Sequence, residues 1–429
     1  MTDHPTVDTA EARARAAGVP VVEFDPECDP RFKADPLGAI AAGREIGDVF
    51  YSTAARGFWV VTSADLYKEV SQQATRFSAR ETFAHYRTPP PIFMKPPNLD
   101  PPEHGKVRKL ITPFLSPHAV RGLEPSARAS VAAIVDEVAE AGECDFMADV
   151  ALRVPAEVFL EQMGLPLSRW REIVALRLLP GKLNASNDPG GLQYKAAVDS
   201  VFGMFREVVV ERRQRPADDI PSFLITQSVD GVPLDDDDIV MLCYVLLGTS
   251  LGTTASTMTF LFQRLADDPP LRRRSTATPK AISALVDEAL RVYPAIGLIS
   301  RVVAEDMDFH GLDWRDGDRV LLLLAAANQD PALFEAPERF DPERSPNRHV
   351  GFGVGPHFCA GATLARMELQ VLVEEWHRRI TDYHVGDLSE LTYELSVAVR
   401  MTTLPIAIDA TLPRADPDGS TRAPASPVL

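Results

Sequence analysis

The sequence contains few cysteines, and none of them is placed for a zinc site or a disulfide framework. Its 429 residues include four cysteines, and no two of them form a CxxC pair. Zinc sites and the cross-linked frameworks of small secreted domains both depend on such regular spacing. A lone cysteine is most often buried and inert, so each one needs a local reason before it is given a function. The cysteines are Cys28, Cys144, Cys243 and Cys359.

Positive charge is also scarce. Lys and Arg number 44 against 61 Asp and Glu, which gives a net charge of -17. Binding to nucleic-acid phosphates needs a basic surface, so this balance argues against a nucleic-acid partner. A local basic patch that docks a protein partner remains compatible with it.

The chain lacks both an apolar N-terminal segment and a flexible linker. Residues 1–20 are polar and mixed in charge, without the hydrophobic core of a signal peptide or membrane anchor, so we expect a cytoplasmic protein. No Gly/Ser-rich stretch divides the chain, although its length exceeds the roughly 250–300 residues of a usual single core. We therefore expect a flexible arm (1–20), one folded domain (21–410) and a disordered tail (411–429).

Hydrophobic patterning predicts a mainly α-helical domain with a smaller β-rich lobe. Helical periodicity covers residues 119–139 and 146–163, and the longest helical stretch runs from Asp235 to about residue 265. Aromatic and β-branched runs around a Gly-bearing turn predict a β-hairpin over 49–62. The apolar residues 320–327 predict a strand that runs into a helix.

The most informative stretch is Gly351–Gly361, which places a cysteine among glycines at the start of a predicted helix. Glycines allow positive φ and let the backbone approach a bulky planar ligand closely. The positive end of the helix dipole favours the thiolate form of Cys359. Such a thiolate is the electron-donating ligand that a haem iron needs. A dinucleotide-binding loop and a merely buried cysteine are the alternatives, but no apolar strand precedes the glycines.

Residues 352–361 match the haem-ligand signature Phe-Gly-x-Gly-x-His-x-Cys-x-Gly at every fixed position. In this the chain resembles the cytochrome P450 family, and further motifs extend the resemblance over residues 49–408. The resemblance implies a haem b cofactor with Cys359 as the ligand of the iron. It also implies that His357 faces a haem propionate, and that Phe352, Gly353 and Gly361 shape the cofactor loop.

A second motif begins at Asp100-Pro-Pro-Glu103, which we expect to start a helix through a capping box. His104 and Arg108 then lie at i and i+4, on one face of that helix. The resembled family carries the same His-x-x-x-Arg pair, which binds haem propionates. The resemblance also implies a propionate contact for Arg301. A solvated surface pair is the alternative for His104 and Arg108.

The middle of the long helix is rich in small polar residues, from Gly248 to Thr254. Hydroxyls that bond back to the i−4 carbonyl, together with glycine, weaken a helix locally and suit a groove where dioxygen and water approach a metal. Close packing against another helix is the alternative. The resembled family has an acid and a threonine here, which relay protons. Thr253 and Thr254 match its threonines, whereas Gly252 replaces the acid and Ser250 replaces a glycine. Protons must then travel through Thr253, nearby hydroxyls and water, or an acid elsewhere.

Glu288 and Arg291 lie at i and i+3 on one helix face, and Arg344 follows about fifty residues later. Taken alone, the first two would be an ordinary surface ion pair. The resembled family joins three such residues in a buried triad that supports the cysteine loop. We therefore assign them a structural role.

The resemblance also indicates which segments contact a substrate. The proline-rich residues 81–99 are expected to cover the pocket, since so long a loop in a compact domain is usually functional. Residues 178–193 are expected to form a lid over it. The expected substrate contacts are Phe93, Met94, Leu251, Ile296, Leu298 and Ile299.

The resemblance implies a haem-thiolate monooxygenase that hydroxylates a hydrophobic small molecule. Dioxygen would be activated with electrons from a separate ferredoxin or flavoprotein. Because Gly252 replaces the acid, an enzyme that uses peroxide or rearranges its substrate is an alternative. A non-catalytic haem sensor or carrier is another, and in it Thr253 would be dispensable.

Overall fold

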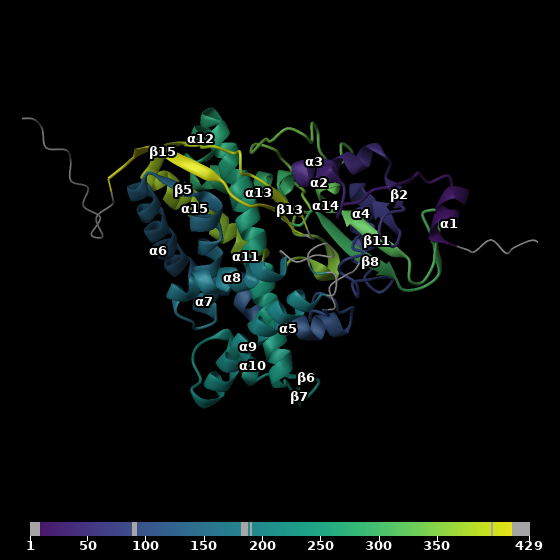
Figure 1. Cartoon of the computed structure of the whole chain (residues 1–429), viewed down its shortest axis with the longest axis horizontal. Helices are drawn as coiled ribbons and strands as arrows, with labels where there is room; N and C mark the ends of the chain where they lie inside the picture. Colours follow the sequence, from purple (N-terminus) through teal and green to yellow (C-terminus); the bar gives the residue numbers. More distant parts are fainter. Residues whose placement is uncertain (1–8, 88–91, 182–187, 189–190, 396–397, 414–429) are drawn as a thin grey trace, which may run out of the picture.

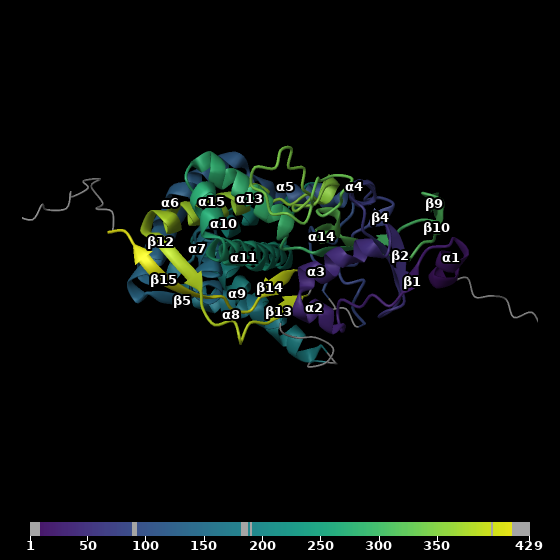
Figure 2. The same ribbon diagram turned by 90° about the horizontal axis from the view of Figure 1, so that it is seen from above.

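The computed structural model describes residues 9–87, 92–181, 188, 191–395 and 398–413. Helices make up most of one side, and a smaller region of strands lies on the other, with α11 passing between them (Figures 1 and 2). The expected class, mainly α with a β-rich lobe, is confirmed. The helices are α1 (Ala10–Ala16), α2 (Pro30–Ala34), α3 (Pro36–Ala41), η1 (Ala42–Glu45), α4 (Ala64–Gln72), α5 (Glu103–Leu115), α6 (Pro117–Ala141), η2 (Phe146–Ala151), α7 (Arg153–Gln162), η3 (Leu167–Arg169), α8 (Trp170–Gly181), α9 (Leu192–Gln214), α10 (Ile220–Ile225), α11 (Asp236–Asp267), α12 (Pro269–Ser275), α13 (Pro279–Val292), α14 (Leu324–Ala327), η4 (Gly355–His357) and α15 (Ala362–Arg379).

The largest sheet has six strands in the order β1-β2-β3-β11-β8-β4. The predicted hairpin over 49–62 is its β2–β3 pair, with Tyr51 opposite Trp59. The predicted strand and helix over 320–327 are β11 and α14. The strands are β1 (Val21–Val22), β2 (Val49–Ser52), β3 (Phe58–Val61), β4 (Phe77–Ser78), β5 (Glu143–Asp145), β6 (Ser228–Val229), β7 (Val232–Pro233), β8 (Leu298–Val303), β9 (Met307–Phe309), β10 (Leu312–Trp314), β11 (Arg319–Leu323), β12 (Ile380–Val385), β13 (Tyr393–Leu395), β14 (Val399–Met401) and β15 (Pro405–Thr411).

α11 is the central helix, and its 32 residues confirm the predicted long helix. It begins after Asp235, whose side chain accepts a hydrogen bond from the backbone N–H of Asp238. It packs against α7, α9 and α15, so both of its apolar ends are covered by other helices. Among the described residues it is the one helix long and apolar enough to cross a membrane, but 67% of its apolar stretch is buried inside the protein. We therefore describe it as a core helix.

The prediction for the N-terminal end of the chain needs correction, and most of the prediction for the C-terminal end lies outside the described residues. The expected flexible arm (1–20) contains α1, which docks on the sheet through the fully buried Ala14 and an ion pair between Arg13 and Asp318. Its residues 1–8 are not described. In the expected tail, residues 411–413 are described and Leu412 bonds to Arg379, whereas residues 414–429 lie outside the described part.

The predicted capping box at the start of α5 is wrong. The helix begins at Glu103 after Pro102, and no side chain caps it. The Asp100 carboxylate instead accepts hydrogen bonds from the Ser78 hydroxyl and from the backbone N–H of Ala79, at 2.5 and 2.8 Å. Asp100 therefore ties the loop before α5 to the edge strand β4.

Candidate functional site: a cysteine loop beside the central helix

The cysteine loop, residues 350–361, is held in shape by glycines that no other residue could replace. Gly353 and Gly355 have φ values of 71° and 74°, in the left-handed region that favours glycine. A Cβ atom on Gly355 would lie 2.5 Å from the backbone oxygen of Ser71 in α4. The loop closes through a 2.9 Å hydrogen bond from the Cys359 N–H to the Phe352 carbonyl. The loop is therefore pressed against α4.

Cys359 lies just before α15, as predicted, and its side chain is accessible. Burial nevertheless raises the pKa of its thiol, and a hydrogen bond from the Gly361 backbone together with the charges of Arg108 and Arg366 only partly opposes that effect. Ala360, the next residue, packs against the apolar cluster that contains Leu247 and Leu251 of α11. The cysteine loop therefore adjoins the central helix.

Four predicted propionate contacts, His104, Arg108, Arg301 and His357, come together beside this loop. The rings of His104 and His357 are 4.2 Å apart, and Arg108 Nη1 donates to the Pro356 carbonyl at 3.2 Å. Burial and the nearby charges of Arg301 and Arg108 lower the pKa of His357 to about 3. Burial also lowers the pKa of His104 and of Arg301.

No described carboxylate forms an ion pair with this cluster, although the charge of Asp100 acts on His104 and on Arg301. Neither Arg108 nor Arg301 forms an ion pair there, and Arg301 is 5% exposed. The buried atoms Arg301 Nε and His357 Nε2 have no hydrogen-bond partner in the described structure. Buried cations and orphaned donors are unfavourable unless an anion joins them. The residues therefore fit a cofactor that presents carboxylates here, as haem propionates do.

The middle of α11 has an open face formed by Gly248, Thr249 and Thr253, beside the buried Gly252. Thr249 is exposed and Thr253 half-buried, although neighbouring residues of the same helix are fully buried. A Cβ on Gly248 would meet no atom within 4 Å. Thr253 Oγ1 donates to the Thr249 carbonyl at 2.7 Å, which is the back-bonding predicted from the sequence. The close-packing alternative therefore does not apply to this face.

Thr254 and Ser250 lie beside the open face and differ in burial and in hydrogen-bond partner. Thr254 is buried and hydrogen-bonded to the carboxyl group of Glu368 in α15, and burial raises the pKa of Glu368 to about 8. Ser250 is half-buried, and its hydroxyl lies 3.5 Å from the Leu247 carbonyl. Glu368 is thus an acid beside the threonine pair, although Gly252 itself carries none.

Two of the predicted substrate contacts are wrong. Leu251 is fully buried with the apolar residues of α7, α8 and α9, on the side of α11 away from the open face. Leu298 is fully buried among side chains that include Phe260 and Leu321. Neither side chain has accessible surface, so neither can contact a ligand without repacking.

The other predicted substrate contacts keep some accessible surface. Ile299 is half-buried, and Ile296 is half-buried where it bridges to Ala398. Phe93 is 48% exposed, and Met94 is half-buried with its N–H bonded to the Asn98 side chain. Part of their loop (88–91) and most of the expected lid (182–187 and 189–190) lie outside the described residues.

The predicted triad is assembled. Glu288 and Arg291 are both fully buried and form a bidentate pair at 2.7 and 2.9 Å, and Arg344 Nε lies 3.4 Å from Glu288. Arg291 also donates to the carbonyls of residues 328, 337 and 339, on the segment that leads to the cysteine loop. The triad therefore anchors this segment to α13.

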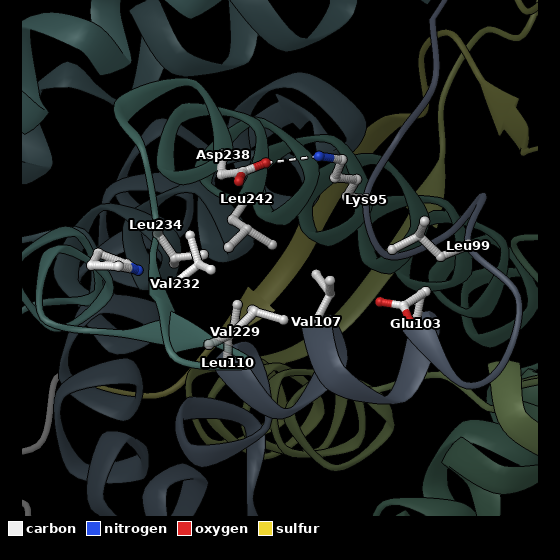
Figure 3. Close-up of a pocket in the computed structure, with 11 residues that line it drawn as sticks. Lys95, Leu99, Glu103, Val107, Leu110, Val229, Val232, Leu234, Asp238 and Leu242 are labelled. Atoms are coloured by element: carbon white, nitrogen blue, oxygen red, sulfur yellow. Dashed lines mark hydrogen bonds and ion pairs between the residues drawn. The ribbon is translucent and has the colours of Figure 1, made fainter.

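A separate pocket of about 260 Å³ lies between α5, the β6–β7 turn and the start of α11. Figure 3 shows it bridged by the ion pair between Lys95 and Asp238, at 2.8 Å. Its wall on α5 is Val107 and Leu110, not the face that carries His104 and Arg108. None of the predicted substrate contacts lines this pocket.

Three residues near the site were missed by sequence reasoning: Tyr67, Arg177 and Glu368. Tyr67 lies fully buried near Arg301, and burial raises its pKa to about 12. Glu368 had a detectable signal, because it is an acid at i+4 from Leu364 and i−4 from Leu372 on the apolar face of α15. Arg177 and Tyr67 had none, since only long-range contacts place them.

Comparisons with known proteins agree with this geometry. Residues 280–376 match the family described as "Cytochrome P450". The chain is 32% identical over 374 residues to "Probable cytochrome P450 127A1" of Sinorhizobium fredii, covering 84% of this chain and 87% of that protein. It is 31% identical over 346 residues to the "Steroid C26-monooxygenase" of Rhodococcus jostii, covering 78% and 71%.

Solved structures give the same result. The crystal structure of CYP108D1 from Novosphingobium aromaticivorans superposes with a TM-score of 0.79 at 26% identity, covering 94% of this chain and 98% of that one. A further relative by sequence, "Cytochrome P450-terp" of a Pseudomonas species, is 30% identical over 292 residues, covering 65% of this chain and 68% of that protein. From the shared fold, the extent of these matches and the cysteine loop, we conclude that the chain belongs to the cytochrome P450 family.

Proposed function

We propose that this chain is a haem-thiolate monooxygenase that hydroxylates a hydrophobic small molecule. The observation that carries the proposal is the accessible Cys359 beside four basic side chains, two of which have a buried nitrogen without a hydrogen-bond partner, and next to the hydroxyl-bearing face of α11. Cys359 would ligate the iron of haem b, while His104, Arg108, Arg301 and His357 would hold the propionates. Bound haem supplies the reductive activation of dioxygen.

The chain's own contribution to that chemistry is proton handling. Thr253 and Thr249 present hydroxyls on the open face, where they can hold water. Glu368 is protonated near neutral pH because its pKa is raised to about 8, so it can donate a proton toward Thr254. We propose that this pair performs the task of the acid that Gly252 lacks.

Electrons would come from a separate ferredoxin or flavoprotein. Phe358, next to the cysteine, is 43% exposed and would lie in the docking surface. The names of two relatives, a steroid monooxygenase and cytochrome P450-terp, support a hydrophobic substrate. Titration of the purified haem protein with steroids, terpenoids, aromatics and fatty acids, followed by the shift of its Soret band, tests this. No shift with any of these classes would contradict a hydrophobic substrate.

Replacing Thr253 by alanine is expected to divert electrons from product to peroxide, because the hydroxyl that holds the proton-carrying water is lost. Product formed per NAD(P)H consumed should fall at least about tenfold, since a positioned proton transfer typically contributes more than that. Thr253→Ser keeps the hydroxyl and should retain most of the coupling. Unchanged coupling in Thr253→Ala would contradict the role and favour the sensor or carrier alternative.

Replacing Glu368 by glutamine is expected to change how stability depends on pH. The buried carboxyl binds its proton up to about pH 8 in the folded state, but only to about 4.5 when unfolded. Wild-type stability should therefore fall as pH rises through this window, by up to about 1.4 kcal/mol per pH unit from this group. The variant should lack that contribution, so its stability relative to wild type should rise from pH 5 to pH 8. Urea unfolding at several pH values measures the difference, and parallel curves would contradict the raised pKa.

The peroxide-using alternative is favoured by one observation, the absence of an acid at Gly252. Turnover with peroxide, compared with turnover with a reductase and NAD(P)H, separates the two. Turnover with peroxide alone would establish the alternative.

A further inference from the structure

Arg177 of α8 reaches the open face of the central helix. Its Nε donates to the Gly248 carbonyl at 2.7 Å, and its Nη2 lies 3.6 Å from where a Cβ on Gly252 would sit. Apart from the local backbone of α11, no other atom of the described residues lies within 4 Å of that Cβ position. The guanidinium therefore stands beside the position at which the resembled family has its acid.

No described carboxylate forms an ion pair with Arg177. Arg400 and Glu394 are among the charged groups that act on it, and they form an ion pair with each other. Burial is the main influence on Arg177 and lowers its pKa. The internal segments outside the described part (88–91, 182–187, 189–190 and 396–397) contain no Asp or Glu. The described buried acid Asp188, which precedes α9, accepts a hydrogen bond from the backbone N–H of Tyr194. Among the described residues, Arg177 therefore has no carboxylate as an ion-pair partner.

Two hydroxyl groups lie near the guanidinium. Tyr244 is one turn before Gly248 on the same helix, and its hydroxyl is hydrogen-bonded to that of Tyr194 in α9. Burial raises the pKa of both phenols, so both keep their protons. One hydroxyl donates to the other, which leaves one O–H of the pair to donate to a ligand. Cationic and hydroxyl donors from α8, α9 and α11 therefore converge on one side of the open face.

We propose that Arg177, with Tyr244 and Tyr194, binds a carboxylate of the substrate, so that the substrate is a hydrophobic monocarboxylic acid. A planar guanidinium matches a carboxylate in geometry, and a single negative charge on the substrate would balance the positive charge of Arg177. A neutral hydrophobic substrate would leave this half-buried cation without an ion-pair partner. The inference rests on the proposed function and narrows its substrate class.

The test uses the purified haem-loaded protein and three matched pairs of probes. These are dodecanoate, 2-naphthoate and dehydroabietate, each with its primary amide, which has a similar shape but no charge. Dissociation constants come from the Soret shift and, independently of the haem spectrum, from isothermal titration calorimetry at pH 7.5. At least one acid should bind about tenfold or more tightly than its amide, as expected for a buried charged pair.

Arg177→Met should remove that preference, weakening the acid by about tenfold while leaving the amide within about twofold. Arg177→Lys keeps the positive charge but lacks the planar guanidinium, so its preference for the acid should lie between that of the wild type and that of Arg177→Met. The control is Arg169→Met, because Arg169 pairs with Glu172 at the surface and its replacement should leave the binding of acid and amide unchanged. Gly252→Asp should also abolish the preference, since its carboxylate would pair with Arg177, whereas the neutral Gly252→Asn should not.

Four results would overturn the inference. In the wild type these are equal binding of acids and amides, binding of amides alone, or no binding of any acid. In Arg177→Met the result is equal weakening of acid and amide binding. A preparation with a haem-thiolate spectrum but no preference for acids would overturn this inference and leave the proposed function intact. A chain that does not take up haem but binds the acids by calorimetry, more tightly than the amides, would contradict the proposed function and leave the carboxylate site intact.

Discussion

Cys359→Ser is expected to abolish the red-shifted Soret band of the reduced carbon monoxide complex and to reduce product formation to background. The band requires a thiolate on the iron, and a serine hydroxyl is a much weaker electron donor. Because the backbone of the loop is fixed by Gly353, Gly355 and the Cys359 N–H bond, the variant should keep its fold. Absorption spectra of the reduced, CO-treated protein measure the effect.

The matched control is Cys28→Ser, which changes an exposed cysteine far along the chain and should leave the band in place. Thermal unfolding of both variants shows whether loss of the band reflects loss of the ligand or of the fold. Retention of the band in Cys359→Ser would remove Cys359 as the ligand of the iron, and the roles proposed for the basic cluster would have to be reassigned.

Glu288→Gln is expected to lower the free energy of unfolding by about 3–5 kcal/mol, because it leaves Arg291 as an unbalanced charge at a fully buried position. The Glu288 carboxylate also accepts hydrogen bonds from the Asp341 N–H and the Asn347 side chain. A neutral amide cannot accept all of these bonds. Loss of haem should accompany the loss of stability, since the triad anchors the segment before the cysteine loop.

The comparison is Glu305→Gln, which breaks a pair of similar length with Arg76 whose acid is 60% exposed. That change should alter stability by less than about 1 kcal/mol. Urea unfolding of the two variants, followed by circular dichroism, measures both effects. Similar small effects in the two variants would mean that the buried triad is dispensable for the fold.

Local patterns predicted much of this structure. The hairpin β2–β3, the strand-to-helix step at β11–α14 and the long helix α11 all follow from periodicity and turn residues close together in the sequence. The cysteine loop was predicted because its glycines, histidine and cysteine lie within one short stretch. His104 and Arg108 were predicted for the same reason, since both lie on one face of α5.

The errors arose where long-range contacts decide. Asp100 looks like a helix cap, but β4 offers its carboxylate a hydroxyl and a backbone N–H instead. Leu251 and Leu298 lie in apolar runs, where periodicity cannot tell which side faces a ligand and which packs in the core. Arg177 and Tyr67 reach the site from helices that are distant in the sequence, and no local pattern marks them.

The contact between Gly355 and Ser71 makes the cysteine loop depend on a part of the chain that is distant in the sequence. The cysteine loop rests on α4 with no space for a single extra carbon, and the basic cluster adds two residues from α5. The segment 280–376 contains the cysteine and the triad that anchors its loop, but not α4 or α5. Parts of the chain nearly three hundred residues apart must therefore pack together before the cysteine loop and the basic cluster are complete.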